Sequence, residues 1–292
     1  MKRFFAALLV VLSVFSLFAQ DDVINIKDAY GRTVSVKAYP ERVVSLAPSI
    51  TEIVFALGKG KSLVGRTDYC DYPSEVKGIE SVGSLMQPNL EKIAALRPDV
   101  VIAASHVTKE AVTKLEELGI PVAVLDYPQS FEGTYEAIIE VGKLLGAQQQ
   151  ADMIIDDIEQ DILDVMSAIG DSNRPRVYYV VSYGQYGDYT AGKGTFIDTL
   201  INMAGGVNVA SDVEGWQYSA EKLLEKDPDI IIVSKYWDTK KGFMSTAPYN
   251  QLTAVKKGNV IEIDNNLVDR QGPRIGKGLK ELAKAIHPEA FE

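Results

Sequence analysis

The chain repeats one segment of its sequence at a distance of 130 residues. NLEKIAALRPDVVIA covers residues 89–103, and SAEKLLEKDPDIIIVS covers residues 219–234. At this offset a glutamate, a proline and an aspartate align with residues of the same type: Glu91 with Glu221, Pro98 with Pro228 and Asp99 with Asp229. Each segment has the pattern of a helix followed by a buried strand. Repetition of a whole structural unit predicts two lobes of the same α/β design.

Short apolar runs alternate with helical patterns in both halves, which indicates βαβ units with parallel, Rossmann-like sheets. In the first half the predicted strands are RVVSLAP, SLVGRT, PDVVIAAS and PVAVLD, and the predicted helices are SITEIVFALG, NLEKIAAL and KEAVTKLEELG. In the second half the strands are RVYYVVSY, PDIIIVSKY and NVIEID, and the helices are TFIDTLINMAGG, SAEKLLEK and PRIGKGLKELAKAIH. We expect Ser49 or Thr51 to cap the first helix, Gly58 to end it, and Asn89 to cap the second.

Two helical patterns follow each other in the middle of the chain. The first covers residues 131–145. The second, about 33 Å long at 1.5 Å per residue, has one apolar face: Ala151, Ile154, Ile155, Ile158, Ile162, Val165, Met166 and Ile169. It divides the chain into an N-terminal lobe at 20–145, a linking helix at 146–170 and a C-terminal lobe at 171–292. Because a helix resists the backbone changes of a hinge, we expect small lobe movements and a preformed cleft.

The amino-terminal segment and the net charge restrict the class of protein. Residues 1–19 have the pattern of a cleaved secretory signal peptide, which predicts a periplasmic protein. An uncleaved membrane anchor is the alternative, although the apolar run at 4–18 is short for a span. No cysteine lies near the expected cleavage site, so a lipid-modified amino terminus is not expected, and the single Cys70 cannot form an intramolecular disulfide. The formal net charge of −10 argues against nucleic acid as a partner.

The motifs of common hydrolases are missing from the sequence. It has no G-x-S-x-G, no H-E-x-x-H and only two histidines, His106 and His287. GDYTAGKGT resembles a phosphate-binding loop, but Gly194 stands where Ser or Thr is required. We therefore expect neither catalysis nor a resident cofactor. His106, which follows the strand VVIAAS, is either a surface residue or an axial ligand of a metal already held in a chelate, because the chain offers no set of direct metal ligands.

Aromatic residues occur where predicted strands end, at the edge that faces a cleft in parallel sheets. Large rings bury a bulky or flat ligand well while their polar ends stay accessible. Arg270, in the loop NNLVDRQGPR, is a candidate for a carboxylate, amide or phosphate on the ligand. The alternative for each residue is an ordinary surface position. Their positions in the chain make eight residues candidate ligand contacts: Ser49, Tyr69, His106, Tyr183, Tyr189, Trp216, Trp237 and Arg270.

Glu91 and Glu221 occupy the first turn of the two repeated helices, one in each lobe. An acidic residue at this position favours the helix dipole by about 0.3 to 1 kcal/mol and needs no partner. Two equivalent carboxylates at the ends of two lobes also suit a two-fold symmetric partner with basic pockets. Both interpretations remain open from the residues alone.

The order and spacing of several motifs resemble the class III periplasmic binding proteins of ABC importers, and within that class the cobalamin-binding proteins. The matching motifs cover nearly the whole mature chain: RVVSLAPSITEIVFALG, VGRTDYCDYP, NLEKIAALRPDVVIA, LEELGIPVAVLD, AGKGTFIDTLINMAGGVNV, GWQYSAEKLLEKDPDIII and DRQGPRIGKGLKEL. The resemblance implies that the chain captures a metal chelate between its lobes. It also implies delivery to a permease dimer with ATPase subunits, whose arginines bind Glu91 and Glu221.

The resemblance also implies ligand contacts at four of the candidate positions: Tyr69, Tyr189, Trp216 and Arg270. The chain departs from the cobalamin-binding pattern at Leu85 and Ala104, where tryptophans are found in that family. Cobalamin is the first expectation, and cobinamide, haem and a ferric siderophore are the alternatives within the class. The alternative from another class is an exported hydrolase that uses His106. We expect a monomer.

Overall fold

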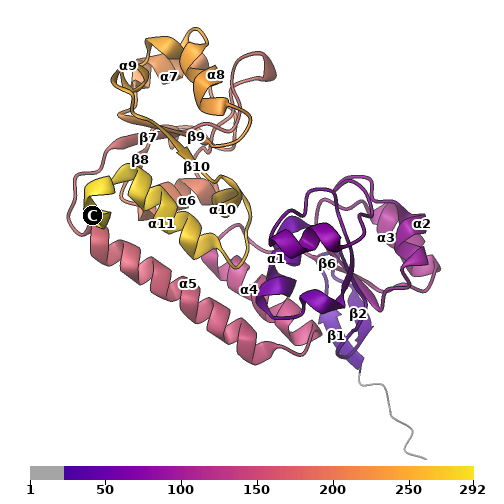
Figure 1. Cartoon of the computed structure of the whole chain (residues 1–292). Helices are drawn as coiled ribbons and strands as arrows, with labels where there is room; N and C mark the ends of the chain where they lie inside the picture. Colours follow the sequence, from indigo (N-terminus) through magenta and orange to yellow (C-terminus); the bar gives the residue numbers. More distant parts are fainter. Residues whose placement is uncertain (1–22) are drawn as a thin grey trace, which may run out of the picture.

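A computed structural model describes residues 23–292, so the predicted signal peptide lies outside the described residues (Figure 1). The described chain folds into two α/β lobes, called here the N-lobe and the C-lobe. The N-lobe sheet has the parallel order β4-β3-β5-β6: β3 (Val43–Ser45), β4 (Leu63–Arg66), β5 (Val100–Ala104) and β6 (Val122–Leu125). The C-lobe sheet has the parallel order β8-β7-β9-β10: β7 (Arg176–Tyr179), β8 (Val207–Asn208), β9 (Ile230–Ser234) and β10 (Val260–Ile263).

Both sheets therefore place their strands in the same order, second, first, third and fourth along the chain. This identity of topology confirms the two-lobe α/β prediction from the repeat. In such sheets the order reverses between the first and third strands, and the carboxyl ends of these two strands form a crevice. The crevice lies after β3 and β5 in the N-lobe and after β7 and β9 in the C-lobe.

The helices pack on the two sheets and between the lobes. Those of the N-lobe are α1 (Pro48–Ala56), α2 (Leu90–Ala95), α3 (Lys109–Glu117) and α4 (Phe131–Leu144). Those of the C-lobe are α6 (Phe196–Met203), α7 (Ala220–Lys226), α8 (Thr239–Ser245), α9 (Thr253–Lys257), α10 (Asn266–Asp269) and α11 (Ile275–Ile286). Within residues 23–292 no helix is both long and apolar enough to cross a membrane.

Helix α5 (Gln148–Ile169) connects the lobes and runs along one side of the molecule (Figure 1). It packs against α4 at its start and against α11 along its length. Ala151, Ile158 and Val165, spaced by seven residues, are buried. Met166, which the apolar pattern placed on the same face, is 56% exposed. Because α5 packs on elements of both lobes, it acts as a stiff support rather than a free linker.

The repeated segments share a backbone conformation as well as a sequence pattern. Arg97 and Asp227, which align at the offset of 130, both follow a repeated helix and have positive φ angles of 45° and 41°. Arg42 Nε donates to the carbonyl of Leu96 at 3.0 Å, and Arg176 Nη1 donates to that of Lys226 at 2.5 Å. An arginine thus satisfies free carbonyls at the end of the repeated helix in both lobes.

A second set of bonds joins each repeated unit to the first strand of its lobe. The Asp99 carboxylate accepts the N–H of Arg42 at 2.9 Å, and the Asp229 carboxylate accepts the N–H of Arg176 at 2.8 Å. The aspartate that directly follows the proline in each segment therefore has the same role in both lobes.

Some expectations for individual elements are wrong or incomplete. Neither Ser49 nor Thr51 caps α1: the helix begins at Pro48 without a side-chain cap, and Thr51 donates its hydroxyl to Ser45 Oγ at 2.8 Å. Asn89 caps α2 as predicted, accepting the N–H of Lys92 at 2.9 Å. The N-lobe also has an antiparallel hairpin that was not predicted, β1 (Val23–Lys27) with β2 (Thr33–Lys37). The strand β8 and the short helices α8, α9 and α10 were not predicted either.

Candidate ligand-binding cleft

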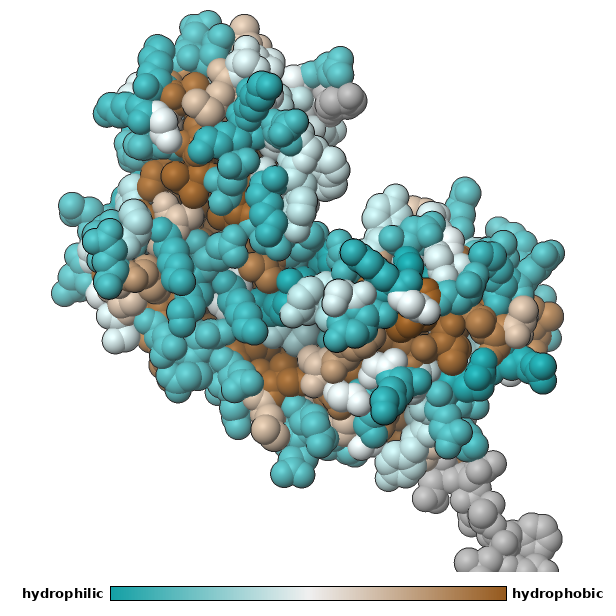
Figure 2. Space-filling model, in the orientation of Figure 1, coloured by the Kyte–Doolittle hydropathy of each residue, from teal (hydrophilic) through white to brown (hydrophobic). Residues whose placement is uncertain are grey.

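A notch separates the two lobes, and the space-filling view shows it as a deep hollow (Figure 2). Three cavities follow one another across this region, and neighbouring cavities share lining residues. We call them the N-lobe cavity (≈ 190 Å³), the interlobe cavity (≈ 290 Å³) and the C-lobe cavity (≈ 570 Å³). Gln129 and Gln271 line both of the first two, and Val181 lines both of the last two. The three cavities therefore adjoin one another along the cleft, from one lobe to the other.

The N-lobe cavity lies at the crevice of its sheet. Ser49 comes from the start of α1 after β3, Ala104 ends β5, and Ser105 follows it. Asp126 follows β6 and adds a carboxylate to the wall. The cavity thus occupies the position that the parallel strand order predicts for a ligand site.

Gln271 fixes the boundary between the lobes. Its amide nitrogen donates to the carbonyl of Pro128 at 2.7 Å and to that of Ser130 at 3.0 Å. Both acceptors belong to the N-lobe side, whereas Gln271 follows α10 of the C-lobe. The side chain that separates the first two cavities is therefore held in place before a ligand binds.

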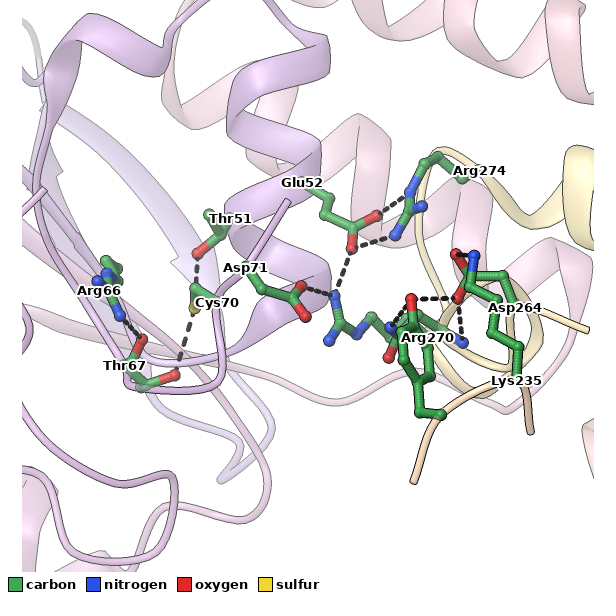
Figure 3. Close-up of polar contacts among 12 residues, drawn as sticks. Thr51, Glu52, Arg66, Thr67, Cys70, Asp71, Lys235, Asp264, Arg270 and Arg274 are labelled. Carbon is green, nitrogen blue, oxygen red and sulfur yellow. Dashed lines mark hydrogen bonds and ion pairs between the residues drawn. The ribbon is translucent and has the colours of Figure 1, made fainter. Parts of the chain in front are cut away.

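A network of ion pairs joins the lobes beside the cleft (Figure 3). Glu52 on α1 accepts bonds from Arg274 Nε and Nη2, both at 2.7 Å, and from Arg270 Nη1 at 3.0 Å. Arg270 Nη1 also donates to Asp71 Oδ1 at 2.6 Å. The guanidinium carbon of Arg274 lies 3.9 Å from the ring centre of Tyr72, a cation–π contact. We name this set, Glu52, Asp71, Tyr72, Arg270 and Arg274, the interlobe network.

The interlobe network keeps its arginines charged. Burial disfavours the charge on Arg270, but bonds to Asp71 and Glu52 outweigh this and raise the pKa of its guanidinium. Burial likewise opposes the charge on Arg274, and Glu52 outweighs it, so this pKa is raised as well. Arg270 was expected to meet the ligand. The structure places its Nη1 between two carboxylates, and a contact with ligand stays a prediction.

The structure places four predicted aromatic contacts in different surroundings. Trp216 lines the interlobe cavity with Phe196 and is 41% exposed. Tyr183 and Trp237 line the C-lobe cavity, where the Trp237 ring is 85% exposed. Tyr189 lines a separate groove with Gln217. The structure therefore brings Trp216, Tyr183 and Trp237 together along the cleft, but not Tyr189.

Tyr69 and His106 lie outside the lining of the three cavities in the described chain. The Tyr69 side chain is 57% exposed in the loop after β4. His106 Nε2 lies 3.0 Å from the carbonyl oxygen of Leu46, an atom that only accepts, so Nε2 carries the hydrogen. The lone pair of Nδ1 is then available, which is the arrangement that metal-ligating histidines use.

The Gly-rich segment that resembles a phosphate loop has a structural role. Thr195 caps α6 by accepting the N–H of Asp198 at 3.2 Å, and the Asp198 carboxylate accepts the N–H of Gly194 at 3.3 Å. A carboxylate of the chain itself thus lies where a phosphate would bind. Among the described residues there is no group of three or more His, Cys, Asp or Glu side chains that is arranged to hold a metal ion.

Glu91 and Glu221 occupy the same place in α2 and α7, the second residue of each helix. Both side chains are exposed, and neither forms an ion pair within residues 23–292. The two helices lie at the outer ends of the two lobes (Figure 1). Two equivalent carboxylates are thus presented on the outside of the molecule, one from each lobe.

Sequence reasoning missed Gln129, Gln271 and Glu52. Gln271 stands next to Arg270 in the loop that was singled out, and Gln129 follows the predicted strand PVAVLD by three residues. Glu52 is the one acidic residue in the apolar helix SITEIVFALG. A charge in a buried helix is a signal, because a buried carboxylate requires a partner.

Two equivalent lobes, a stiff connecting helix and a cleft lined by adjoining cavities between the crevices of two parallel sheets define a two-lobe binding protein. A family model described as "Periplasmic binding protein" matches residues 43–267. The chain therefore belongs to the periplasmic binding protein family, and it is the non-enzymatic substrate-binding component of an ABC importer. This membership excludes the hydrolase alternative that used His106.

Three known proteins show the range of the similarity. An uncharacterized ABC transporter substrate-binding lipoprotein of Bacillus subtilis is 34% identical over 92% of this chain and 87% of its own length. A cobalamin-binding protein of Halobacterium salinarum is 31% identical over 89% of this chain and 73% of its own. The structure of an apo periplasmic heme-binding protein from Roseiflexus matches with a TM-score of 0.78 and 28% identity, over 86% of this chain and 99% of that one.

Proposed function

We propose that the chain binds a corrinoid, cobalamin in the first place, in the cleft between its lobes. The observation that carries the proposal is the set of adjoining cavities with exposed aromatic residues at Trp216 and Trp237. An indole left in water favours a ligand that covers it, because each large aromatic side chain can bury some 150 to 250 Å². A ligand with a broad, partly apolar surface fits this arrangement.

The neutral amides at the centre of the cleft favour a corrinoid. Gln129 and Gln271 line both the N-lobe cavity and the interlobe cavity. The backbone carbonyl of Trp216 accepts the N–H of Thr190 at 2.8 Å and is therefore already occupied. The guanidinium groups of Arg270 and Arg274 are occupied by Glu52 and Asp71. A neutral ligand leaves these ion pairs intact, whereas an anionic one competes with them.

Ala104 lines the N-lobe cavity, at a position where the cobalamin-binding pattern has tryptophan. A smaller side chain leaves more room there. Haem and a ferric siderophore therefore remain the alternative ligands. His106 is the candidate axial ligand for haem, and this role requires the ligand to reach beyond the three cavities, whose lining does not include His106. A relative named as a heme-binding protein and one named as a cobalamin-binding protein both support a metal chelate as the class of ligand.

Delivery of the ligand is proposed to occur by docking of Glu91 and Glu221 on a permease dimer with its ATPase subunits. The segment at residues 1–19 is proposed to direct export and to be removed, which leaves a monomeric periplasmic protein. The relative in Bacillus subtilis is a lipoprotein, so membrane attachment is the alternative. Fractionation of the native host into soluble and membrane fractions distinguishes the two.

The ligand is identified by titrating residues 20–292 with cyanocobalamin, dicyanocobinamide, haemin and a ferric hydroxamate siderophore in a calorimeter. The proposal expects cyanocobalamin to bind most tightly. Preferential binding of haemin or of the siderophore would assign the alternative ligand. Absence of binding to all four would contradict the class of ligand.

A further inference from the structure

The C-lobe cavity has an unusual set of polar groups. It lies after β7 and β9, at the crevice of the C-lobe sheet, and Val181 connects it to the interlobe cavity. Its polar side chains include three aliphatic hydroxyls and the phenol of Tyr183, and its lining has no Lys, Arg, His, Asp or Glu. Its ≈ 570 Å³ is within the usual range of about 300 to 1,000 Å³ for a small-molecule site. The cavity is therefore polar but uncharged.

The three aliphatic hydroxyls, those of Ser182, Thr239 and Thr246, each donate their only hydrogen to a backbone carbonyl. Thr239 Oγ1 donates to the carbonyl of Tyr236 at 2.6 Å, and Thr246 Oγ1 donates to that of Gly242 at 2.7 Å. Ser182 Oγ donates to the carbonyl of Gly187 at 3.1 Å. A carbonyl oxygen has no hydrogen to give, so the direction of these bonds is fixed. Toward a ligand these oxygens therefore act as acceptors.

Two further side chains of the cavity can donate. The Tyr183 ring packs edge-on against Phe243 at 5.2 Å and Tyr249 at 5.7 Å between centroids, which fixes where its hydroxyl points. That hydroxyl lies beside Gly242, where a Cβ would be only 2.2 Å away, so the close approach requires glycine. Gln185 adds an amide with both donors and an acceptor. A ligand group with N–H donors and one carbonyl acceptor satisfies both sets.

The Trp237 indole forms an exposed flat wall beside these groups. Trp237 and Asp238 have positive φ angles of 58° and 52°, which are uncommon for residues other than glycine. Trp237 is 85% exposed, and its ring lies 5.7 Å from the Tyr236 ring between centroids. Such strain persists where the surrounding structure imposes it, and it is found at ligand sites.

We propose that the C-lobe cavity selects for primary carboxamides at the edge of a flat ligand and against carboxylates. This inference rests on the proposed function and deepens it, because a corrinoid carries primary amides at its edge whereas haem carries carboxylates. A primary amide donates its two N–H hydrogens to two of the three hydroxyl oxygens of Thr239, Thr246 and Ser182, and its carbonyl accepts from Tyr183 or Gln185. A carboxylate has no hydrogen for the three acceptors and finds no cation in the lining, so its burial there is unfavourable.

The proposal is tested with three corrinoids that differ only in their edge groups: dicyanocobinamide with amides, dicyanocobyrinic acid with carboxylic acids, and its heptamethyl ester. The ester is neutral and accepts hydrogen bonds but cannot donate them. Unaltered protein is expected to bind the amide form at least tenfold more tightly than the ester, and the ester more tightly than the acid at neutral pH. Equal affinities for the amide and the ester would overturn the proposal.

The residues are tested by the double variant Thr239→Val and Thr246→Val, which keeps the side-chain shape and removes both acceptors. It is expected to weaken cobinamide binding about tenfold and to leave ester binding within about twofold. Thr113→Val on the exposed face of α3 in the N-lobe is the matched control, and circular dichroism verifies folding. Equal losses for both ligands would overturn the assignment to these hydroxyls.

If the double variant does not fold, Ser182→Ala provides the same comparison of amide with ester. Binding of all three corrinoids with one affinity contradicts the amide preference but leaves the corrinoid function standing. Absence of binding to any corrinoid by the unaltered protein contradicts both.

Discussion

Arg274 of the C-lobe binds the Glu52 carboxylate of the N-lobe through two parallel hydrogen bonds of 2.7 Å, although 222 residues separate them in the chain. The Glu52 side chain is 2% exposed and that of Arg274 is 13% exposed. Arg270 adds a third bond to the same carboxylate. One buried carboxylate thus holds two guanidinium groups and fixes how the lobes meet.

Glu52→Gln is expected to lower the free energy of unfolding by about 3 kcal/mol, because it leaves two buried arginines without their shared counter-ion. The measurement is urea denaturation followed by circular dichroism. Glu75→Gln, an exposed glutamate on the same side of the N-lobe, is the control and should change stability by less than about 0.5 kcal/mol. If both variants unfold at the same urea concentration, the network does not stabilise the lobe contact.

Acid is expected to destabilise the N-lobe through Asp28 in the β1–β2 turn. Burial opposes ionisation of Asp28, but hydrogen bonds from Arg32 outweigh it and lower the pKa of its carboxyl below 3.8. A lowered folded-state pKa means that this contribution to stability is complete above the unfolded-state value and is lost as pH falls through the folded-state value. Asp28→Asn should therefore be less stable at neutral pH, with a smaller loss below about pH 4.

Unfolding free energies measured in steps between about pH 6 and pH 2.5 provide the comparison. Asp171→Asn, at an exposed turn after α5, serves as the control. Parallel pH curves for Asp28→Asn and the unaltered protein would show that Asp28 does not contribute to the acid dependence.

The alternation of apolar runs and helical patterns was enough to predict two α/β lobes with parallel sheets and the helix α5, but not the order of the strands. These patterns are local in the sequence, because each helix or strand has to bury its own apolar face and therefore shows the periodicity of that face. The interlobe network was not predictable, because its partners are more than 190 residues apart and no local rule pairs them. Arg270 was singled out from its loop, but the two carboxylates beside it come from α1 and from the loop after β4.

The candidate site was predictable to the extent that strand ends mark a cleft. Ser49, Trp216 and Trp237 lie in its cavities for that reason. The two glutamines were missed because neutral side chains in loops have no periodicity or charge pattern. The hairpin was missed although β1 and β2 alternate exposed and buried residues, since its strands precede the repeated units.

Trp216→Ala is expected to weaken ligand binding by about 2 kcal/mol, or about thirtyfold in Kd, because its ring forms an apolar wall of the interlobe cavity. Trp216→Phe keeps a ring and should lose less than about fivefold. Both losses of affinity are measured by calorimetric titration with whichever of the four candidate ligands binds the unaltered protein most tightly. Equal affinity of the alanine variant and the unaltered protein would remove Trp216 from the ligand contacts.

Charge reversal at both Glu91 and Glu221 is expected to leave ligand affinity unchanged and to abolish stimulation of the importer ATPase in proteoliposomes. The carboxylates lie outside the cleft, and a basic partner would meet repulsion in place of attraction. Glu117→Lys with Glu225→Lys changes the net charge equally at other exposed helix positions and should keep stimulation. Normal stimulation by the Glu91 and Glu221 double variant would leave these residues only the role of favouring the helix dipole.

The two aligned left-handed residues are expected to respond in opposite directions to glycine. Arg97 is exposed, and its own carbonyl accepts from Arg42, a bond that glycine keeps. Arg97→Gly relieves the left-handed strain and should raise the free energy of unfolding by about 0.5 to 1 kcal/mol. Asp227→Gly relieves the same strain but removes a carboxylate that accepts from Thr253 N at 2.8 Å and Thr253 Oγ1 at 2.6 Å.

The loss of those two charge-assisted bonds should exceed the relief at Asp227, for a net decrease of about 1 kcal/mol at neutral pH. Because the bonds to Thr253 lower the pKa of Asp227, this decrease should shrink as pH falls below about 3.8. Urea denaturation of both variants at neutral and acid pH measures the difference. A decrease for both at neutral pH would show that the arginine side chain, and not only its backbone, supports the end of α2.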